Sequence, residues 1–261
     1  MTAPAPDTVT RGDCLDVMKE IPSRSVDFIL TDPPYLVRYV DRTGRSVKND
    51  NNDSWIDPAF AEMHRVLKDS AFCVSFYAWN RADRFIEAWR KAGFSLAGHF
   101  AFPKRYASSR HYTQYQHEQA YLLMKGHPKA PENPPPDVIP WTYTGNRLHP
   151  TQKPVGIFLP LLKAYTKPGD VVLDPFAGSA STLVAAQEMD RRFIGIELDP
   201  DHQATATARL QSRFMGDNVV PLPKASRYHA PRVEPAKADL WHNAVANSTR
   251  SAPAYAAGPK R

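Results

Sequence analysis

The residues best suited to chemistry lie in the loop Asp32-Pro33-Pro34-Tyr35, which follows the apolar run Val26–Leu30. That run is typical of a short buried strand, so the loop begins where a strand ends. Two consecutive prolines fix two φ angles and remove two N–H donors, which leaves the carbonyl oxygens beside Asp32 with few partners in their own loop. Acceptor oxygens next to an aromatic ring suit a planar ligand that carries an NH2 group, such as a nucleobase. When this stretch is considered alone, an ordinary structural turn is the alternative.

A second loop with chemical potential runs from Asp174 to Thr182, between the apolar run Val171–Leu173 and a predicted helix. Its small residues let backbone N–H groups approach a ligand closely, and the start of the helix favours negative charge. About 20 residues after Gly178, Glu197 closes the next predicted strand, where a carboxylate can accept hydrogen bonds from ribose hydroxyls. The combination predicts a nucleoside-bearing cofactor. No glycine precedes Gly178 by two residues, which disfavours NAD. A glycine-bearing turn with an ordinary surface glutamate is the alternative.

The elements that must position these loops alternate along the chain. Spacing of apolar residues and flanking Pro or Gly predict helices over 14–21, 56–67, 81–91, 155–165, 183–189 and 200–214. Short apolar runs predict strands at 26–30, 71–77, 100–102, 119–124, 171–173 and 193–196. This alternation predicts an α/β fold with a doubly wound, mostly parallel sheet.

Four motifs, taken in chain order, resemble the β class of S-adenosylmethionine-dependent DNA amino-methyltransferases. They are Gly12-Asp13-Cys14-Leu15, Asp32-Pro33-Pro34-Tyr35, His149-Pro150-Thr151-Gln152-Lys153-Pro154 and Asp174-Pro175-Phe176-Ala177-Gly178-Ser179. In that family the catalytic half precedes the cofactor half, which is a circularly permuted order on a Rossmann-like methyltransferase fold. The resemblance covers roughly residues 10–214. One departure is Ala180, where the family usually has a second glycine; its methyl group would narrow the cofactor pocket or disfavour a positive φ angle.

The resemblance implies S-adenosylmethionine as the cofactor and assigns roles to the residues that match. Asp13 would bond the adenine amino group and Glu197 the ribose, while Lys153 and Thr151 would hold the carboxylate and the second loop the methionine end. Asp13 also stands where a helix N-cap is expected, and both roles can hold. The predicted cofactor-binding set is Asp13, Cys14, Thr151, Lys153, Asp174, Pro175, Phe176, Gly178, Ser179, Ser181, Thr182 and Glu197.

The same resemblance implies a catalytic set of Asp32, Pro33, Pro34 and Tyr35. An exocyclic amino nitrogen is a poor nucleophile because its lone pair is delocalised into the ring. If Asp32 and the carbonyl of Pro33 accept its two N–H bonds, the lone pair can aim at a sulfonium methyl group for direct in-line transfer without a metal. The base would be flipped out of duplex DNA at a cost of a few kcal/mol, and Tyr35 would stack on it.

The identity of the base rests on the first residue of this loop. Asp at that position resembles the adenine-N6 enzymes, whereas cytosine-N4 enzymes usually carry Ser, so we expect adenine N6 as the target and cytosine N4 as the runner-up. A non-catalytic DNA-binding regulator with the same fold is an alternative from another class, motivated by Ala180 and a basic tail. Methylation of RNA or protein is a smaller possibility.

Charge and composition restrict the remaining classes. The 261 residues carry a formal net charge of +6, which favours a polyanionic partner such as double-stranded DNA. Residues 221–261 contain seven Lys or Arg and two Asp or Glu, so the charge is concentrated in a Pro- and Ala-rich tail. Cys14 and Cys73 show no partner pattern for a disulfide or a zinc site. Without a signal-peptide pattern or a membrane-length apolar run, we expect a cytoplasmic, nucleoid-associated protein that binds no metal or membrane.

We expect a methyltransferase domain over 1–220, with DNA-recognition insertions at about 36–55 and 103–140, and the tail as a separate flexible appendage. Cations and aromatic residues alternate in the insertions, which suits phosphate contacts and stacking, although a solvated hairpin is the alternative for the second one. Residues 130–140 contain five prolines and should form an extended connector. The resemblance further suggests a homodimer. Predicted DNA-contacting residues are Arg38, Arg42, Arg45, Lys104, Arg105, Tyr106, Arg110 and Tyr112.

Overall fold

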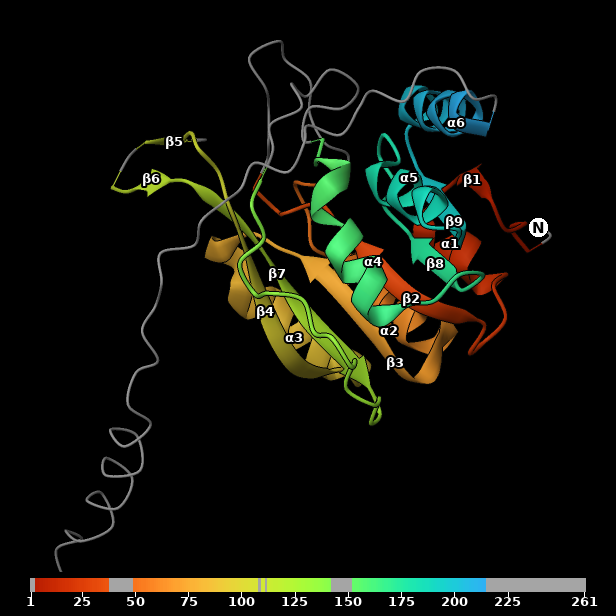
Figure 1. Cartoon of the computed structure of the whole chain (residues 1–261), viewed down its shortest axis with the longest axis horizontal. Coiled ribbons are helices and arrows are strands. Elements are labelled where there is room, and N and C mark those ends of the chain that lie inside the picture. The colour runs from red at the N-terminus through yellow and green to blue at the C-terminus, as the bar shows by residue number, and fades with distance from the viewer. Residues whose placement is uncertain (1–2, 38–48, 108, 111, 142–151, 215–261) are drawn as a thin grey trace, which may run out of the picture. The chain divides into compact units, whose positions relative to one another are not determined.

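A computed structural model describes residues 3–37, 49–107, 109–110, 112–141 and 152–214, all within the unit Met1–Val219 (Figure 1). The predicted tail, residues 221–261, lies outside the described residues. So do the predicted site residues Arg38, Arg42, Arg45 and Thr151, and the side chain of Arg110.

In the described part of the chain, seven strands form one sheet in the order β1-β9-β8-β2-β3-β7-β4. The first five in this order are parallel to one another, and β7 runs antiparallel to both β3 and β4. The predicted doubly wound, mostly parallel α/β sheet is therefore confirmed. The strands are β1 (Thr8–Arg11), β2 (Val26–Thr31), β3 (Leu67–Phe76), β4 (Ser95–Pro103), β7 (His117–Lys125), β8 (Val171–Asp174) and β9 (Arg192–Glu197).

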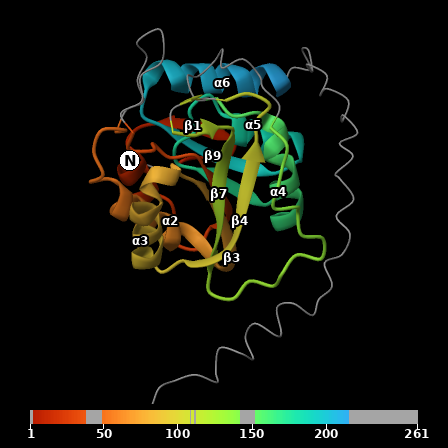
Figure 2. The same cartoon turned by 90° about the vertical axis from the view of Figure 1, so that its left-hand side faces the viewer.

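Helices cover both faces of the sheet, as Figures 1 and 2 show. Along β2, Phe28 and Leu30 pack into a core with α4, α5 and α6, whereas Val26 and Ile29 pack into a second core with α1, α2 and α3. From Phe28 to Leu30 successive side chains point to opposite faces, so one apolar run supplies both cores. A register shift between Val26 and Phe28 interrupts this alternation. The helices are α1 (Cys14–Lys19), α2 (Ile56–Val66), α3 (Ala82–Ala92), α4 (Leu159–Tyr165), α5 (Ser181–Glu188) and α6 (Pro200–Phe214), with 3-10 turns η1 (Trp79–Arg81) and η2 (Val155–Ile157).

Several element boundaries differ from those predicted. Strand β1 was not predicted because only Val9 of its four residues is buried, so it has no apolar run; parallel pairing with β9 holds it in the sheet. The helix predicted over 56–67 ends at Val66, and Leu67 already begins β3. The helix predicted over 155–165 is divided into η2 and α4, with Phe158 between them.

The connector 130–140 is extended, as predicted, and it covers the outer edge of the sheet. Ala101 in β4 donates its N–H to the Asp137 carbonyl at 2.7 Å and accepts the N–H of Ile139 at 2.9 Å, and Trp141 bonds the Pro103 carbonyl at 3.1 Å. These bonds satisfy backbone groups of an edge strand that would otherwise be open to association. Past the ends of β4 and β7, β5 (Ser109–Arg110) and β6 (Gln114–Tyr115) form a small hairpin that projects from the sheet (Figure 1).

Close packing beneath the second loop requires a glycine in β9. A Cβ atom built on Gly195 would lie 2.4 Å from Leu183 Cδ1 in α5 and 3.2 Å from Val9 Cγ2 in β1. A side chain at this position would displace the end of the Leu183 side chain and press on Val9 and Ala177. Gly195 thus lets Leu183 of α5 and Ala177 of the second loop pack closely on β9.

Candidate active site

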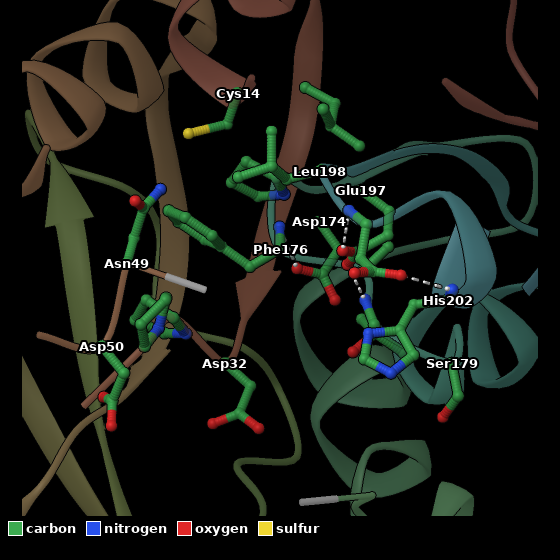
Figure 3. Close-up of a pocket in the computed structure, with 18 of the residues that line it drawn as sticks. Cys14, Asp32, Asn49, Asp50, Asp174, Phe176, Ser179, Glu197, Leu198 and His202 are labelled. Carbon is green, nitrogen blue, oxygen red and sulfur yellow. Dashed lines mark hydrogen bonds between the residues drawn. The ribbon is translucent and has the colours of Figure 1, made fainter. Parts of the chain in front are cut away.

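A pocket lies at the carboxyl ends of the parallel strands β1, β2, β8 and β9, where ligands bind in open α/β sheets (Figure 3). All predicted catalytic residues line it, together with every predicted cofactor-binding residue that the structure describes. Those residues are Asp13, Cys14, Asp32, Pro33, Pro34, Tyr35, Lys153, Asp174, Pro175, Phe176, Gly178, Ser179, Ser181, Thr182 and Glu197. Their individual roles stay predictions.

Backbone N–H groups hold the carboxylate of Glu197 on both sides. Gly178 donates its N–H to Glu197 Oε2 at 2.8 Å, and Asp199 donates to Oε1 at 2.8 Å (Figure 3). Gly178 has a φ of 53°, and the Ala177 N–H reaches the Ile196 carbonyl at 2.9 Å. The end of β9 and the second loop are thus fastened to each other, while each carboxylate oxygen keeps a lone pair for a ligand.

Asp174 is buried at the end of β8 with its own partners. Its Oδ1 accepts the Phe176 N–H at 3.1 Å and the hydroxyl of Thr31 at 3.0 Å. Burial raises the pKa of Asp174 to about 7, against these hydrogen bonds, which lower it. This carboxyl group therefore changes its charge near neutral pH.

Ala180 adopts the left-handed backbone that glycine would tolerate more easily. Its φ is 65° and its ψ is 30°, at the N-cap of α5. The predicted conflict with a positive φ angle is confirmed. The methyl group is fully buried in the core with α4 to α6, so it packs under the pocket rather than narrowing it.

Asp13 caps helix α1 by accepting the Leu15 N–H at 2.9 Å, which confirms the predicted N-cap. The neighbouring Gly12 N–H reaches the Glu197 carbonyl at 3.0 Å, so the start of α1 lies beside the end of β9. Burial raises the pKa of the Cys14 thiol to about 12, so Cys14 stays protonated and unreactive at neutral pH. Cys14 therefore contributes to the pocket as part of its wall.

Asp32 has one oxygen engaged and one without a partner. Oδ2 pairs with the ammonium of Lys153, whereas Oδ1 and the hydroxyl of Tyr35 make no hydrogen bond of standard geometry in the described part of the chain. The Tyr35 hydroxyl lies near enough to Asp32 to help lower the pKa of this carboxyl group. Burial raises the pKa of Asp32, and the Lys153 ammonium opposes that rise. After Tyr35, Leu36 has a φ of 61°, and Arg81 donates to its carbonyl at 3.3 Å. The loop thus presents Asp32 Oδ1 as a hydrogen-bond acceptor, and the contact with Arg81 restrains the backbone after Tyr35.

Sequence reasoning missed an aromatic wall and a helix start in this pocket. Trp55 packs against Phe176 with ring centroids 5.1 Å apart, and its indole N–H bonds the carbonyls of Asn49 and Asn52 at 3.1 Å each. Asp199 Oδ1 accepts the His202 N–H at 3.3 Å in the first turn of α6, and both residues line the pocket. Trp55 closes the predicted insertion 36–55, but no spacing in the sequence connects it with Phe176.

The predicted DNA-contacting residues of the second insertion fall into two groups. Tyr112 is 94% exposed, and Arg105 and Tyr106 also reach the surface. Lys104 differs, because its side chain is 5% exposed, it pairs with Glu118, and its ammonium lies 4.9 Å from the ring centroid of Trp141. The structure thus places Lys104 inside the fold and not on the surface that the sequence predicted, since the connector brings Trp141 over it.

Among the described residues, no group of three or more His, Cys, Asp or Glu side chains could hold a metal ion. None of the helices in the described residues combines the length and the apolar character that spanning a bilayer requires.

Comparisons with known proteins agree with this geometry. A relative from Escherichia coli (strain K12), described as "Putative methylase YubD", is 54% identical over 200 residues, covering 77% of this chain and 88% of the relative. A second, described as DNA adenine methyltransferase YhdJ from the same organism, is 30% identical over 246 residues, covering 78% of this chain and 82% of the relative.

Two solved structures share the fold. The M1.HpyAVI-SAM complex superposes with a TM-score of 0.62 at 23% identity, over 77% of this chain and 98% of that chain. The PvuII DNA methyltransferase, which is cytosine-N4-specific, superposes with a TM-score of 0.65 at 18% identity, over 84% of this chain and 89% of that chain. The family model N6_N4_Mtase, described as DNA methylase, matches residues 26–208, a span that holds both loops and most of the sheet. This chain is therefore a member of the N6_N4_Mtase family of DNA methylases.

Proposed function

We propose that this protein transfers a methyl group from S-adenosylmethionine to the exocyclic N6 of a flipped-out adenine in a specific duplex DNA sequence. The observation that carries the proposal is the unpaired Oδ1 of Asp32 in a pocket that also holds the fastened carboxylate of Glu197. One pocket thus offers an acceptor for an amino group and a carboxylate for a ribose.

The residues of the pocket fit the proposed cofactor. Glu197 would accept the ribose hydroxyls, Asp13 the adenine amino group, and the loop from Asp174 to Thr182 would enclose the methionine end. Phe176 and Trp55, whose rings pack edge to face, line the pocket and supply apolar ring surface for a purine. When bound, S-adenosylmethionine supplies an electrophilic methyl group on a sulfonium.

The chain's own contribution to catalysis is to hold the target. Asp32 Oδ1 and the Pro33 carbonyl would accept the two amino hydrogens, which draws the nitrogen toward tetrahedral geometry, and Tyr35 would stack on the base. With S-adenosylmethionine bound, the amino nitrogen that Asp32 and Pro33 orient would take the methyl group as the carbon–sulfur bond breaks, and sulfur would keep the electron pair. The product amine loses a proton, for which Asp32 is the nearest base in the proposed arrangement.

Adenine is the favoured base for two reasons. Asp stands at the first position of the catalytic loop, and the relative that is 30% identical is described as a DNA adenine methyltransferase. Cytosine N4 is the alternative, because the family includes both amino targets by its name and one structural neighbour is described as cytosine-N4-specific.

We further propose that the exposed side chains near the projecting hairpin, Arg105, Tyr106 and Tyr112, meet the DNA. Arg38, Arg42, Arg45 and Arg110 remain predicted contacts. A homodimer and a cytoplasmic, nucleoid-associated location also stay predictions.

Nucleoside mass spectrometry tests the proposal. Unmethylated duplex DNA is incubated with the full chain and S-adenosylmethionine, digested and analysed for methylated nucleosides, with a heat-inactivated sample as the control. We expect N6-methyladenine. N4-methylcytosine alone would replace adenine with cytosine as the target. DNA binding without methylation of either base would support the non-catalytic regulator instead.

A further inference from the structure

Lys153 lines the pocket and is buried. A lysine is rarely fully buried unless its ammonium is paired. Its side chain is 5% exposed, and its ammonium pairs with Asp32 Oδ2. The same nitrogen lies 5.1 Å from the ring centroid of Tyr35 and 4.9 Å from that of Phe76. A buried ammonium is costly unless it is paired, so the carboxylate and the two aromatic faces together hold the Lys153 side chain in place.

The groups around Asp32 come from five parts of the fold. Lys153 approaches from the segment before η2, Glu118 acts from β7, Asp174 lies at the end of the neighbouring β8, and Tyr35 follows in the same loop. Tyr115 at the end of β6 also feels the charge of Asp32. Glu118 and Asp174 are acidic, and Glu118 has its own lysine partner in Lys104. Lys153 is therefore the cation that offsets acidic neighbours at Asp32.

We propose that Lys153 is a positioning residue for methyl transfer, which holds Oδ2 of Asp32 so that Oδ1 is left as the acceptor for the target amino group. The proposal rests on the proposed function. A carboxylate without this contact could rotate, because terminal carboxyl torsions are broad, and could take up a proton in its acidic, buried surroundings. Both changes would remove the acceptor from where the amino group must bind.

This role differs from the one that the family resemblance implied, in which Lys153 holds the carboxylate of the cofactor. An ammonium has three donors, so one contact with Asp32 does not forbid a second contact. The two roles nevertheless predict different measurements. A cofactor ligand controls the affinity for S-adenosylmethionine, whereas a positioning residue controls the transfer rate and its dependence on pH.

The test compares Lys153→Met, Lys153→Gln and Lys153→Arg with the wild type. Single-turnover methyl transfer is measured with saturating DNA and S-adenosylmethionine from pH 5 to 9, and the Kd for S-adenosylmethionine is measured separately. Lys125→Met is the matched control, because Lys125 is also a buried lysine, bonded to the carbonyls of His64 and Leu67. Thermal unfolding shows which variants are folded. If Lys153→Met does not fold, Lys153→Gln replaces it in the comparison.

We expect Lys153→Met to lower the transfer rate at pH 7 by about 100-fold and to move the acid limb of the pH profile upward by about one unit or more. The limb moves upward because an unpaired Asp32 is protonated more easily. Lys153→Arg should restore most of the rate, the Kd should change by less than about 3-fold, and the control should match the wild type.

Two results would overturn the inference. One is a rise in Kd of about 10-fold or more with an unmoved acid limb and a normal rate at saturation, which would make Lys153 a cofactor ligand. The other is a folded Lys153→Met or Lys153→Gln variant with wild-type kinetics. Failure of the proposed function is distinguishable from both, because the wild type would then transfer no methyl group to DNA.

Discussion

Glu197 and Asp32 are carboxylates that follow parallel strands on either side of β8, yet the fold holds them in different ways. Both oxygens of Glu197 accept backbone N–H groups, from Gly178 and Asp199. Asp32 has one oxygen on the side chain of Lys153 and one without a partner in the described residues. Main-chain N–H groups fix the carboxylate of Glu197, whereas one oxygen of Asp32 can still accept a hydrogen bond.

The difference shows that one pocket can contain both a rigidly held carboxylate and a carboxylate with a free acceptor oxygen. Main-chain hydrogen bonds move only when the loop rearranges, so the chain's own backbone already orients the Glu197 carboxylate. A buried acceptor without a donor costs free energy, and a substrate amino group can recover that cost on binding. We infer that the cofactor half is preassembled and that the target base completes the other half.

The largest expected effect is on catalysis. Asp32→Ala removes the open acceptor, so we expect methyl transfer to DNA at saturating S-adenosylmethionine to fall by about 1000-fold. Tritiated methyl transfer to duplex DNA measures this. Asp16→Ala, on the exposed side of α1, is the control and should keep full activity. Substantial methyl transfer by Asp32→Ala would show that Asp32 is not the required acceptor for the target amino group.

The second prediction concerns the preassembled half. The pKa of Asp174 is about 7 in the folded protein, far above its value in an unfolded chain, so the native state holds the extra proton between about pH 4 and 7. The free energy of unfolding contributed by this group is therefore lost as the pH rises through 7.

Asp174→Asn keeps an acceptor for Thr31 and Phe176 but cannot ionise. We expect the wild type to lose about 2–4 kcal/mol relative to this variant between pH 5 and 8. Urea denaturation at both pH values measures the difference. Parallel pH dependence of the two proteins would show that Asp174 is not the group that titrates.

A third change weakens the main-chain fastening. Glu197→Gln has one acceptor oxygen, so either Gly178 or Asp199 loses the partner for its N–H. We expect the Kd for S-adenosylmethionine to rise by about 10- to 100-fold, while the transfer rate at saturation falls far less. Isothermal titration calorimetry gives the Kd. Normal binding of S-adenosylmethionine together with a lost transfer rate would show that Glu197 acts in methyl transfer and not in cofactor binding.

The smallest effect is expected at Ala180. Ala180→Gly relieves a positive φ angle at the N-cap of α5 but loses a buried methyl group and makes the unfolded chain more flexible. These contributions oppose each other, so we expect the free energy of unfolding to change by less than about 1 kcal/mol. The Kd for S-adenosylmethionine should change by less than about 3-fold, because the methyl group does not line the pocket. A large gain in affinity would show that the methyl group obstructs the site.

Local sequence was sufficient to predict the two loops and the helix start at Asp13. Each depends on an apolar strand followed by turn or capping residues, and these signals lie within a few positions of one another. The fold class followed from the same signals. The short strand β1 was missed because it is defined by its pairing with β9 and not by its own residues.

Long-range contacts decided what the sequence could not predict. Lys153 lies 121 positions from Asp32 along the chain, so no spacing connects the two. Lys104 looked like a surface cation in an aromatic-rich segment, but Glu118 and Trp141 enclose it. In both cases a lysine expected to contact a ligand pairs with a largely buried carboxylate that is distant in the sequence.

The most direct test of a preassembled cofactor half is to measure S-adenosylmethionine binding by calorimetry in the absence of DNA. The wild type and Asp32→Asn are compared under the same conditions. We predict binding to each chain at one equivalent, with Kd values that agree within about 3-fold. Binding that requires DNA, or a loss of about 10-fold or more in Asp32→Asn, would contradict the division of the pocket into a finished half and an open half.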